Sequence, residues 1–386
     1  MSANSSNPEL TVTLNDTAAP VVCMEHATAS GHVLAQLELN VPGTLNSLSL
    51  EMIDLLRPAL THWAQRSDVV AVLITGSGDK AFCAGGDIQA LYHAIVRNHA
   101  AGETVDSYPF DFFEREYRLD YQIHTYPKPV VALGHGIVMG GGFGIFGGSR
   151  YRLVTERTRL AFPEVTIGLF PDAGGTWLLR NMPIHLGVFL GMTGSHLNAA
   201  DALASGVGTH CIAAAQRPEV LAGLLQLPWA GFETSDHETI ASWLAQLASA
   251  PTMAAETAAI PTALNADGSV AEIAERVRAL AGASAWVDRG IAAMNAGCPT
   301  SVGVVVEQLK RAPALDLDDC FRLEMTVGTH CALEKDFVEG VRALLIDKDG
   351  APNWQHASVA ALPQAHVDGH FAEPWDVNPL HDLGGL

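Results

Sequence analysis

A run of three consecutive glycines, Gly140 to Gly142, most constrains what this chain can fold into. It lies in the segment HGIVMGGGFG (135–144), which follows a predicted apolar strand at 129–133 and opens a predicted helix. Glycine is costly at a helix start, because it loses more conformational freedom on folding than any other residue. Either another backbone or a substrate must therefore approach closely here. Tight helix packing alone would also explain the run.

The segment matches neither of two common phosphate-binding patterns. No GK[ST] follows the glycines, as a P-loop requires. No acidic residue stands at the end of a following strand, where a dinucleotide-binding fingerprint places one. The glycines therefore indicate close approach without indicating a nucleotide.

The first half of the chain alternates strands and helices. Residues 33–39 alternate apolar and polar side chains, as a half-buried strand does, whereas 69–75 are fully apolar, as in a parallel strand covered on both faces. Ser49 is the predicted N-cap of a helix over 50–66. Strand–helix repeats of this kind predict an α/β class.

The second half changes character and is predicted to be mostly helical. Segments 218–283, 301–309, 320–333 and 337–345 have the composition or the spacing of helices. We therefore divide the chain into a flexible N-terminal tail (1–19), an α/β core (20–217) and a mostly helical C-terminal region (218–386).

Composition excludes several classes of function. The formal net charge is −20, so non-specific binding to nucleic acid is disfavoured, because it needs basic patches that replace counterions. The Ser/Asn-rich start lacks a signal stretch and no apolar run is long enough to span a membrane, which predicts a cytoplasmic protein without membrane association. The six cysteines form no CxxC pair and are expected to be reduced core thiols, and no metal site is expected.

A second glycine turn occurs in AFCAGGDI (81–88), between a predicted strand and a predicted helix. The pair Gly85 and Gly86 lets the backbone present N–H groups to a ligand, and Asp87 is suited to cap the helix that follows. A plain turn without a ligand is an equally simple interpretation.

A third segment, LAFPEVTIGLFPDAGG (160–175), carries two isolated carboxylates, Glu164 and Asp172, in an apolar run. A carboxylate in such a place either is exposed by a turn or is desolvated, with a raised pKa suited to acid–base work. A solvated turn residue for Glu164 and a helix N-cap for Asp172 are the simpler alternatives. Together the three segments predict two N–H groups that converge on one carbonyl oxygen, beside a carboxylate pair.

In these three segments the chain resembles the enoyl-CoA hydratase/isomerase (crotonase) superfamily, over about 31–207. The resemblance implies a spiral of ββα turns, an acyl-CoA substrate and an oxyanion hole made by the N–H groups of Gly86 and Gly141. It also implies that Gly85 and Asp87, together with the loop containing Asn46 and Leu48, contact the substrate.

One position departs from the hydratases of that superfamily, which carry a glutamate where this chain has Gly144. Segments 161–175, 298–301 and 336–350 instead resemble the 3-hydroxyisobutyryl-CoA hydrolases, in which Glu116 would be a substrate contact. The implied reaction is hydrolysis of a 3-hydroxyacyl-CoA thioester, with Glu164 and Asp172 as catalytic residues and no cofactor beyond the coenzyme A of the substrate. There are three alternatives: a hydratase or isomerase of the same fold, a hydrolase of another acyl-CoA such as 3-hydroxypropionyl-CoA, and a non-catalytic acyl-CoA-binding protein. A homo-oligomer is possible.

Overall fold

The computed structural model describes residues 12–385. The predicted tail therefore lies partly outside the described residues, at 1–11. Within the described part of that tail, the Asn15 N–H donates to the Cys23 carbonyl oxygen at 2.8 Å.

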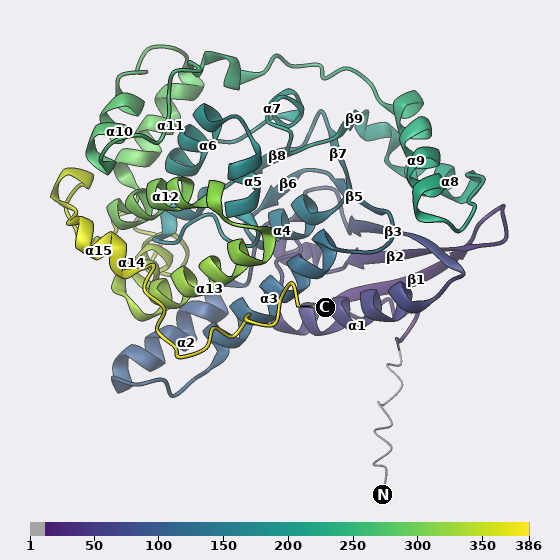
Figure 1. Cartoon of the computed structure of the whole chain (residues 1–386), viewed down its shortest axis with the longest axis horizontal. Helices are drawn as coiled ribbons and strands as arrows, with labels where there is room; N and C mark the ends of the chain where they lie inside the picture. Colours follow the sequence, from purple (N-terminus) through teal and green to yellow (C-terminus); the bar gives the residue numbers. More distant parts are fainter. Residues whose placement is uncertain (1–11, 386) are drawn as a thin grey trace, which may run out of the picture.

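Most of the strands form one six-stranded sheet in the order β1-β2-β3-β5-β7-β9 (Figure 1). The β1–β2 pair is antiparallel and the other pairs are parallel. Apolar runs form its centre, because parallel strands are covered on both faces. The strands are β1 (Val21–Ala27), β2 (Val33–Leu39), β3 (Val69–Gly76), β5 (Val130–Gly134), β7 (Tyr151–Thr155) and β9 (His210–Ile212).

Three short strands form a second, wholly parallel sheet in the order β4-β6-β8. They are β4 (Ala81–Cys83), β6 (Ile137–Met139) and β8 (Arg159–Ala161). Each follows a strand of the large sheet, so the chain steps from one sheet to the other in every turn of a spiral. The predicted direct turn from strand to helix at 135–144 was wrong in this respect, since β6 intervenes. The predicted α/β spiral itself is confirmed.

Two helices of the spiral begin at the N-cap residues that the sequence predicts. Ser49 caps α1, with its side chain accepting the Met52 N–H at 3.2 Å. Asp87 caps α2 in the same way, accepting the Ala90 N–H at 3.1 Å. The helices up to residue 204 are α1 (Leu50–Gln65), α2 (Ile88–Ala101), α3 (Tyr108–His124), α4 (Gly141–Gly148), α5 (Gly175–Asn181), α6 (Ile184–Thr193) and α7 (Ala199–Ala204).

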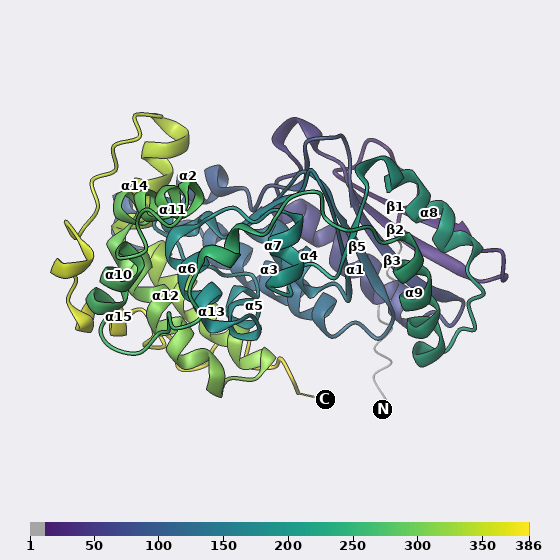
Figure 2. The ribbon, with the colours of Figure 1, turned by 90° about the horizontal axis from the view of Figure 1, so that it is seen from above.

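Every element described after residue 217 is a helix, and these helices lie at two ends of the molecule (Figure 2). Helices α8 and α9 cover the large sheet, where Val220 and Leu244 join a buried cluster with Leu34 and Val131. The others pack around α2, α3 and α6. The helices of this second half are α8 (Arg217–Gln226), α9 (Glu233–Leu247), α10 (Val270–Arg278), α11 (Ala285–Ala296), α12 (Pro299–Arg311), α13 (Leu317–Leu333), α14 (Lys335–Val341) and α15 (Gln364–Gly369).

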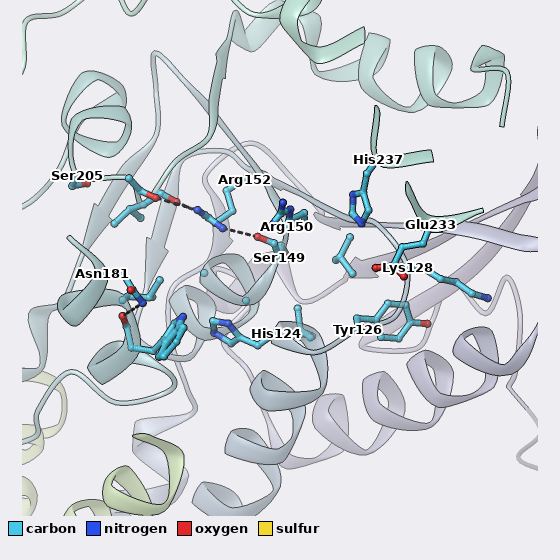
Figure 3. Close-up of a pocket in the computed structure, with 18 residues that line it drawn as sticks. His124, Tyr126, Lys128, Ser149, Arg150, Arg152, Asn181, Ser205, Glu233 and His237 are labelled. Carbon is cyan, nitrogen blue, oxygen red and sulfur yellow. Dashed lines mark hydrogen bonds between the residues drawn. The ribbon is translucent and has the colours of Figure 1, made fainter. Parts of the chain in front are cut away.

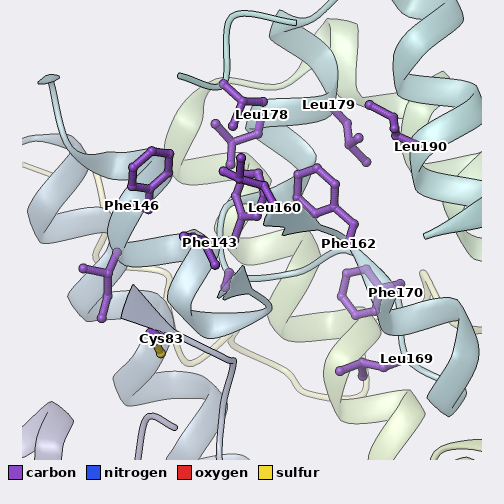
Figure 4. Packing of buried hydrophobic residues seen from close by; sticks show 14 of the residues in the cluster. Cys83, Phe143, Phe146, Leu160, Phe162, Leu169, Phe170, Leu178, Leu179 and Leu190 are labelled. Carbon is purple, nitrogen blue, oxygen red and sulfur yellow. The ribbon is translucent and has the colours of Figure 1, made fainter. Parts of the chain in front are cut away.

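Helix α4 is wholly buried, and its glycines explain how. A Cβ on Gly142 would overlap the backbone of Cys83, and one on Gly144 would lie 2.6 Å from Asp120 of α3. The residues of α4 that do carry side chains pack against apolar neighbours (Figure 4). The ring centroids of Phe143 and Phe162, for example, are 4.2 Å apart. The glycine run thus allows close packing on several sides of one short helix.

Candidate active site

A small cavity of about 80 Å³ lies where the two glycine turns meet α3 and the short 3-10 helix Pro163–Ile167. Its volume is well below the ~300 Å³ of the smallest usual ligand pockets, so only the reacting end of a ligand would fit inside. The cavity brings together six of the nine residues predicted for the site: Gly85, Gly86, Glu116, Gly141, Glu164 and Asp172.

The backbone turns at Gly85 and Gly140 bring the two motifs into contact. Both residues have positive φ angles, 116° and 50°, which side-chain-bearing residues rarely adopt. A Cβ on Gly140 would lie 3.2 Å from the Gly85 Cα. Glycine at both positions therefore permits the approach of one turn to the other.

Gly86 and Gly141 both line this cavity, and their backbones lie close together. A Cβ on Gly141 would be 3.5 Å from the Gly86 nitrogen. Neither N–H donates a hydrogen bond to any residue in the described part of the chain. Gly141 is the first residue of α4, and the first N–H groups of a helix have no partner within it. Such a pair can stabilise negative charge on a substrate oxygen.

Glu164 places a buried carboxyl group against these turns, with 3% of the residue exposed. Its Oε1 would lie 3.7 Å from a Cβ on Gly140, and its Oε2 has no hydrogen-bond partner within residues 12–385. Burial, with a smaller effect of the Asp172 charge, raises the pKa of Glu164 well above its ordinary value. The predicted desolvated carboxylate is therefore the arrangement found, and a solvated turn residue is not.

Asp172 faces the same cavity and is held by Tyr117, whose hydroxyl donates to Oδ2 at 2.7 Å. Burial raises the pKa of Asp172 to about 6, although the Tyr117 hydrogen bond opposes that shift. Asp172 is not the N-cap of α5, as the alternative interpretation had it. Gly174 holds that position, because its left-handed conformation turns the chain into the helix.

Two residues of the C-terminal helices hold the segment that carries Asp172. Both carboxylate oxygens of Glu324 on α13 accept backbone N–H groups, from Gly174 and from Thr176, each at 2.8 Å. Gln308 on α12 donates to the Pro171 carbonyl oxygen at 2.7 Å. Neither residue was predicted for the site. A lone glutamate inside an apolar helix was the only available signal for Glu324.

Glu116 comes from α3 and is 2% exposed. Its Oε1 is so close to Gly141 that a Cβ there would overlap it. Burial, followed by the charges of Asp172, Glu324 and Glu164, raises the pKa of Glu116 well above its ordinary value. The carboxyl groups of Glu116, Glu164 and Asp172 are buried near one another, so their negative charges would repel if all were ionised. Bound protons must therefore neutralise part of this charge.

The other three predicted site residues do not line the cavity. Asn46 is fully buried, and its side chain donates to the Ser77 and Ala81 carbonyl oxygens at 3.0 Å. Leu48 pairs its backbone with that of Gly86, and Asp87 is the N-cap of α2. These residues shape the first glycine turn, and direct contact with a substrate remains a prediction for them.

A second, larger cavity of about 580 Å³ lies at the C-terminal ends of α3 and α4 (Figure 3). Its wall contains none of the residues predicted for the site. It carries basic side chains, among them Lys128, Arg150 and Arg152, and the ring of His124. The two cavities thus lie at opposite ends of the same helix pair.

A protein-family model described as enoyl-CoA hydratase/isomerase matches residues 34–371. The chain belongs to the enoyl-CoA hydratase/isomerase family. This confirms the superfamily resemblance seen in the glycine and carboxylate segments.

Relatives at the sequence level carry a narrower name within the enoyl-CoA hydratase/isomerase family. A "3-hydroxyisobutyryl-CoA hydrolase, mitochondrial" of Gallus gallus is 34% identical over 361 residues, 90% of each chain. A protein of the same name from Homo sapiens is 32% identical over 362 residues, again 90% of each. The mitochondrial label describes those proteins, and the cytoplasmic location of this chain remains a prediction.

Solved structures of the family share the fold over nearly the whole chain. A carnitinyl-CoA dehydratase from Mycobacterium thermoresistibile has a TM-score of 0.78 at 30% identity, covering 93% of this chain and 98% of its own. An enoyl-CoA hydratase from Rhodobacter sphaeroides 2.4.1 has a TM-score of 0.76 at 30% identity, covering 91% and 97%.

Several expectations from the sequence concern features other than the site itself. All six cysteines are free and buried, as predicted. No helix within residues 12–385 combines the length and the apolar character needed to cross a membrane. The predicted lack of nucleic-acid binding and the possible homo-oligomer remain predictions.

Proposed function

We propose that this chain hydrolyses 3-hydroxyisobutyryl-CoA to 3-hydroxyisobutyrate and free coenzyme A. One observation carries the proposal: the N–H groups of Gly86 and Gly141, which have no partner within residues 12–385, share a cavity with the carboxyl group of Glu164. That combination suits attack on a thioester carbonyl, and the relatives named as hydrolases of this substrate agree with it.

The chemistry assigned to the site is acyl transfer to water. The thioester oxygen would accept hydrogen bonds from Gly86 and Gly141, which stabilise the negative charge that forms when the carbonyl carbon is attacked. Glu164 either attacks that carbon itself, giving a mixed anhydride that water opens, or takes a proton from the attacking water. The C–S bond breaks, and the thiolate leaves with little need for acid assistance.

Asp172 and Glu116 flank Glu164 and would contact the acyl group or the water. Their carboxyl groups face the same cavity from two different elements. Burial raises the pKa of Glu116 well above its ordinary value, so this residue can donate a hydrogen bond to the 3-hydroxyl group as a neutral acid. Asp172, with a pKa of about 6, can accept a hydrogen bond from the hydroxyl as a carboxylate. Their contact with the hydroxyl would favour 3-hydroxyacyl chains over plain acyl chains.

The position of Gly144 supports hydrolysis rather than hydration. A Cβ there would lie 2.6 Å from Oδ2 and 2.7 Å from Cγ of Asp120. A glutamate like that of the hydratases would therefore need Asp120 to move. The space beside Gly144 is filled by the Asp120 side chain of α3.

The test is release of free thiol from 3-hydroxyisobutyryl-CoA by the purified protein, followed with a colorimetric reagent, beside hydration of crotonyl-CoA. We expect thiol release without hydration. Hydration without thiol release would make the chain a hydratase. Neither reaction, with retained acyl-CoA binding, would make it a binding protein.

Glu164→Gln is expected to lower turnover by at least ~100-fold, the usual scale for a lost acid–base group, while acyl-CoA still binds. Glu238→Gln, at an exposed position on α9, is the matched control and should keep full turnover. Near-normal turnover of Glu164→Gln would remove this residue from the reaction.

No cofactor enters the proposed reaction beyond the coenzyme A that the substrate carries. Turnover should therefore survive dialysis against a metal chelator. A loss that added metal ions restore would overturn this part of the proposal.

A further inference from the structure

Tyr117 of α3 is the one residue within 12–385 whose side chain donates a hydrogen bond to Asp172. Its hydroxyl oxygen lies 2.7 Å from Oδ2 of Asp172, which is 55 positions further along the chain. Asp172 lines the cavity of the candidate active site, whereas Tyr117 does not. Any effect of Tyr117 on a bound substrate must therefore pass through Asp172.

The ring of Tyr117 is held by packing from two helices. The residue is fully buried, and its ring is stacked on that of Phe113 of the same helix, with centroids 5.8 Å apart. From α13, the ring of Phe321 lies at 6.3 Å, and a Cβ built on Gly328 would be 3.1 Å from the Tyr117 hydroxyl oxygen. Helices α3 and α13 thus keep the hydroxyl beside Asp172.

This hydrogen bond has a fixed direction. Burial, followed by the charges of nearby acidic residues, raises the pKa of Tyr117 well above its ordinary value, so the phenol keeps its proton. An ionised carboxyl group can only accept hydrogen bonds, and a bond donated to it favours the ionised form. Tyr117 therefore favours the state in which Asp172 accepts and does not donate.

The other groups around Asp172 do not replace this hydrogen bond. Burial raises the pKa of Asp172 to about 6, Tyr117 has the largest opposing effect, and the backbone of Asp172 itself has a smaller one. Within the described residues, no titratable group that faces Asp172 is a cation. These groups are Glu116, Tyr117 and Asp120 on α3, Glu164 on the 3-10 helix, and Glu324 and Cys331 on α13.

We propose that Tyr117 is a positioning residue that holds Asp172 as a hydrogen-bond acceptor and thereby selects acyl-CoA substrates with a hydroxyl group on the third carbon. The inference rests on the proposed function. A hydroxyl group can donate to the Asp172 carboxylate. A plain acyl chain would leave that buried carboxylate without the donor, and sites built to bind a hydroxyl group reject analogues that lack it.

A 3-oxo group should be rejected for a second reason. Glu116 faces the same cavity and, as a neutral acid, can donate to either a hydroxyl or a carbonyl oxygen. A carbonyl oxygen has no proton to give to Asp172, so it would place one acceptor against another. Discrimination between a 3-hydroxyl and a 3-oxo group therefore depends on Asp172, the residue that Tyr117 holds.

Tyr117→Phe tests the inference, because it removes the hydroxyl and keeps the ring. We measure kcat/KM for thiol release from 3-hydroxyisobutyryl-CoA and from isobutyryl-CoA, which lacks the hydroxyl group. Where isobutyryl-CoA turns over too slowly, its competitive inhibition constant takes the place of kcat/KM. The value for the hydroxy substrate should fall about tenfold, the usual effect of a lost hydrogen bond to a charged group, while the value for isobutyryl-CoA stays nearly unchanged.

The pH profile gives a readout that a merely structural role would not move. Without the Tyr117 hydrogen bond the pKa of Asp172 should rise, because the ionised form loses its main support. The acid limb of kcat/KM for 3-hydroxyisobutyryl-CoA should then move to higher pH, by about one unit for a tenfold effect. Isobutyryl-CoA donates no hydrogen bond to Asp172, so its acid limb should stay in place.

Two further variants complete the test. Tyr126→Phe is the matched control, because its hydroxyl donates to the Leu60 carbonyl oxygen at 2.7 Å and the residue does not line the active-site cavity. It should keep the wild-type preference and pH profile. Gly328→Ala keeps the phenol but crowds its oxygen from α13, so it should reduce the preference in the same direction, also if Tyr117→Phe does not fold.

A second pair of thioesters tests the 3-oxo argument. 3-Hydroxybutyryl-CoA and acetoacetyl-CoA differ only at the third carbon, and the wild-type protein should prefer the hydroxy compound. Tyr117→Phe should reduce that preference. An equal or greater wild-type kcat/KM for acetoacetyl-CoA would overturn the assignment of Asp172 as acceptor.

The outcomes separate this inference from the proposed function. Thiol release by the wild-type protein, with the same substrate preference and the same acid limb in Tyr117→Phe, overturns the role of Tyr117 alone. An equal loss for the hydroxy and the plain thioester overturns it as well. Absence of thiol release from the wild-type protein overturns the inference and the proposed function together.

Discussion

Glu324 takes no direct part in the proposed chemistry, but it holds the backbone segment that carries Asp172. Its carboxylate accepts the N–H groups of Gly174, 150 positions earlier, and of Thr176, 148 positions earlier. The glutamate is fully buried. Asp172 and its neighbours are thereby held in position by a helix from another part of the chain.

Replacing Glu324 with alanine should both destabilise the fold and lower turnover. Two buried N–H groups would lose their acceptors, and each such loss costs about 1–3 kcal/mol. Denaturant unfolding should therefore report a loss of at least ~2 kcal/mol, and thiol release should fall. Glu373→Ala, at an exposed position, is the control. Unchanged unfolding and turnover would mean that the turn holds its shape without Glu324.

The site shows clearly which residues the sequence alone can predict. Gly86, Gly141 and Glu164 lie in short continuous motifs, and the resemblance of those motifs to the crotonase superfamily implies their roles. Tyr117 and Glu324 act through contacts with residues 55 and 148–150 positions away. No local pattern encodes such distances, so neither residue could be predicted.

At the scale of elements, the closeness of α3 and α4 depends on glycine. Gly144 points directly at the Asp120 carboxyl group, since a Cβ added to Gly144 would lie 2.6 Å from Oδ2. Alanine is ordinarily the better residue inside a helix. Here the packing of the two helices outweighs that preference.

Gly144→Ala should therefore destabilise the protein by about 1–3 kcal/mol, the usual cost of overpacking a core. Gly369→Ala is the control, because Gly369 also belongs to a helix, of which it is the last residue. A Cβ at Gly369 would meet nothing within 4 Å. It should be neutral or slightly stabilising. Thermal unfolding of the two variants side by side decides the point, and equal effects would contradict it.

Some of the longer elements were predicted with correct bounds or a correct start, although the seven-residue strand β1 was not predicted. The seven-residue strand β2 has the bounds expected from its alternation, 33–39, and α1 begins after its predicted cap. Strand β6 has three residues between glycine turns and pairs only with strands distant in sequence. Its pairing is decided by the spiral rather than by local preference, so the sequence did not reveal it.

For the whole molecule, buried acidic residues set the dependence of stability on pH. Burial raises the pKa of Asp172 to about 6 and that of Glu324 to about 8, and it also raises the pKa values of Glu116, Asp120 and Glu164. These carboxyl groups therefore bind more protons in the folded state than in the unfolded state. Buried histidines such as His124 and His135 have lowered pKa values and act in the opposite sense below about pH 7. Above about pH 7 the histidines are neutral in both states, so stability must fall as the pH rises further.

Urea unfolding measured from about pH 7 to 8 should show this fall. Each fully contributing group lowers the free energy of unfolding by up to about 1.4 kcal/mol per pH unit. Asp120→Asn removes one such group without changing the shape of the site, so its slope should be shallower. A wild-type free energy of unfolding that rises with pH over this range would contradict the shifts.

The hydrogen bonds from the Asp172 segment to Glu324 of α13 also have a consequence during protein synthesis. A ribosome extends the chain from its N-terminus, and domains can fold as they emerge. Both glycine turns and Glu164 are synthesised well before Glu324. A nascent chain can therefore complete its spiral while the Asp172 turn still lacks its acceptor. Full hydrolytic activity would then appear only after Glu324 has been synthesised, later than the folding of the spiral.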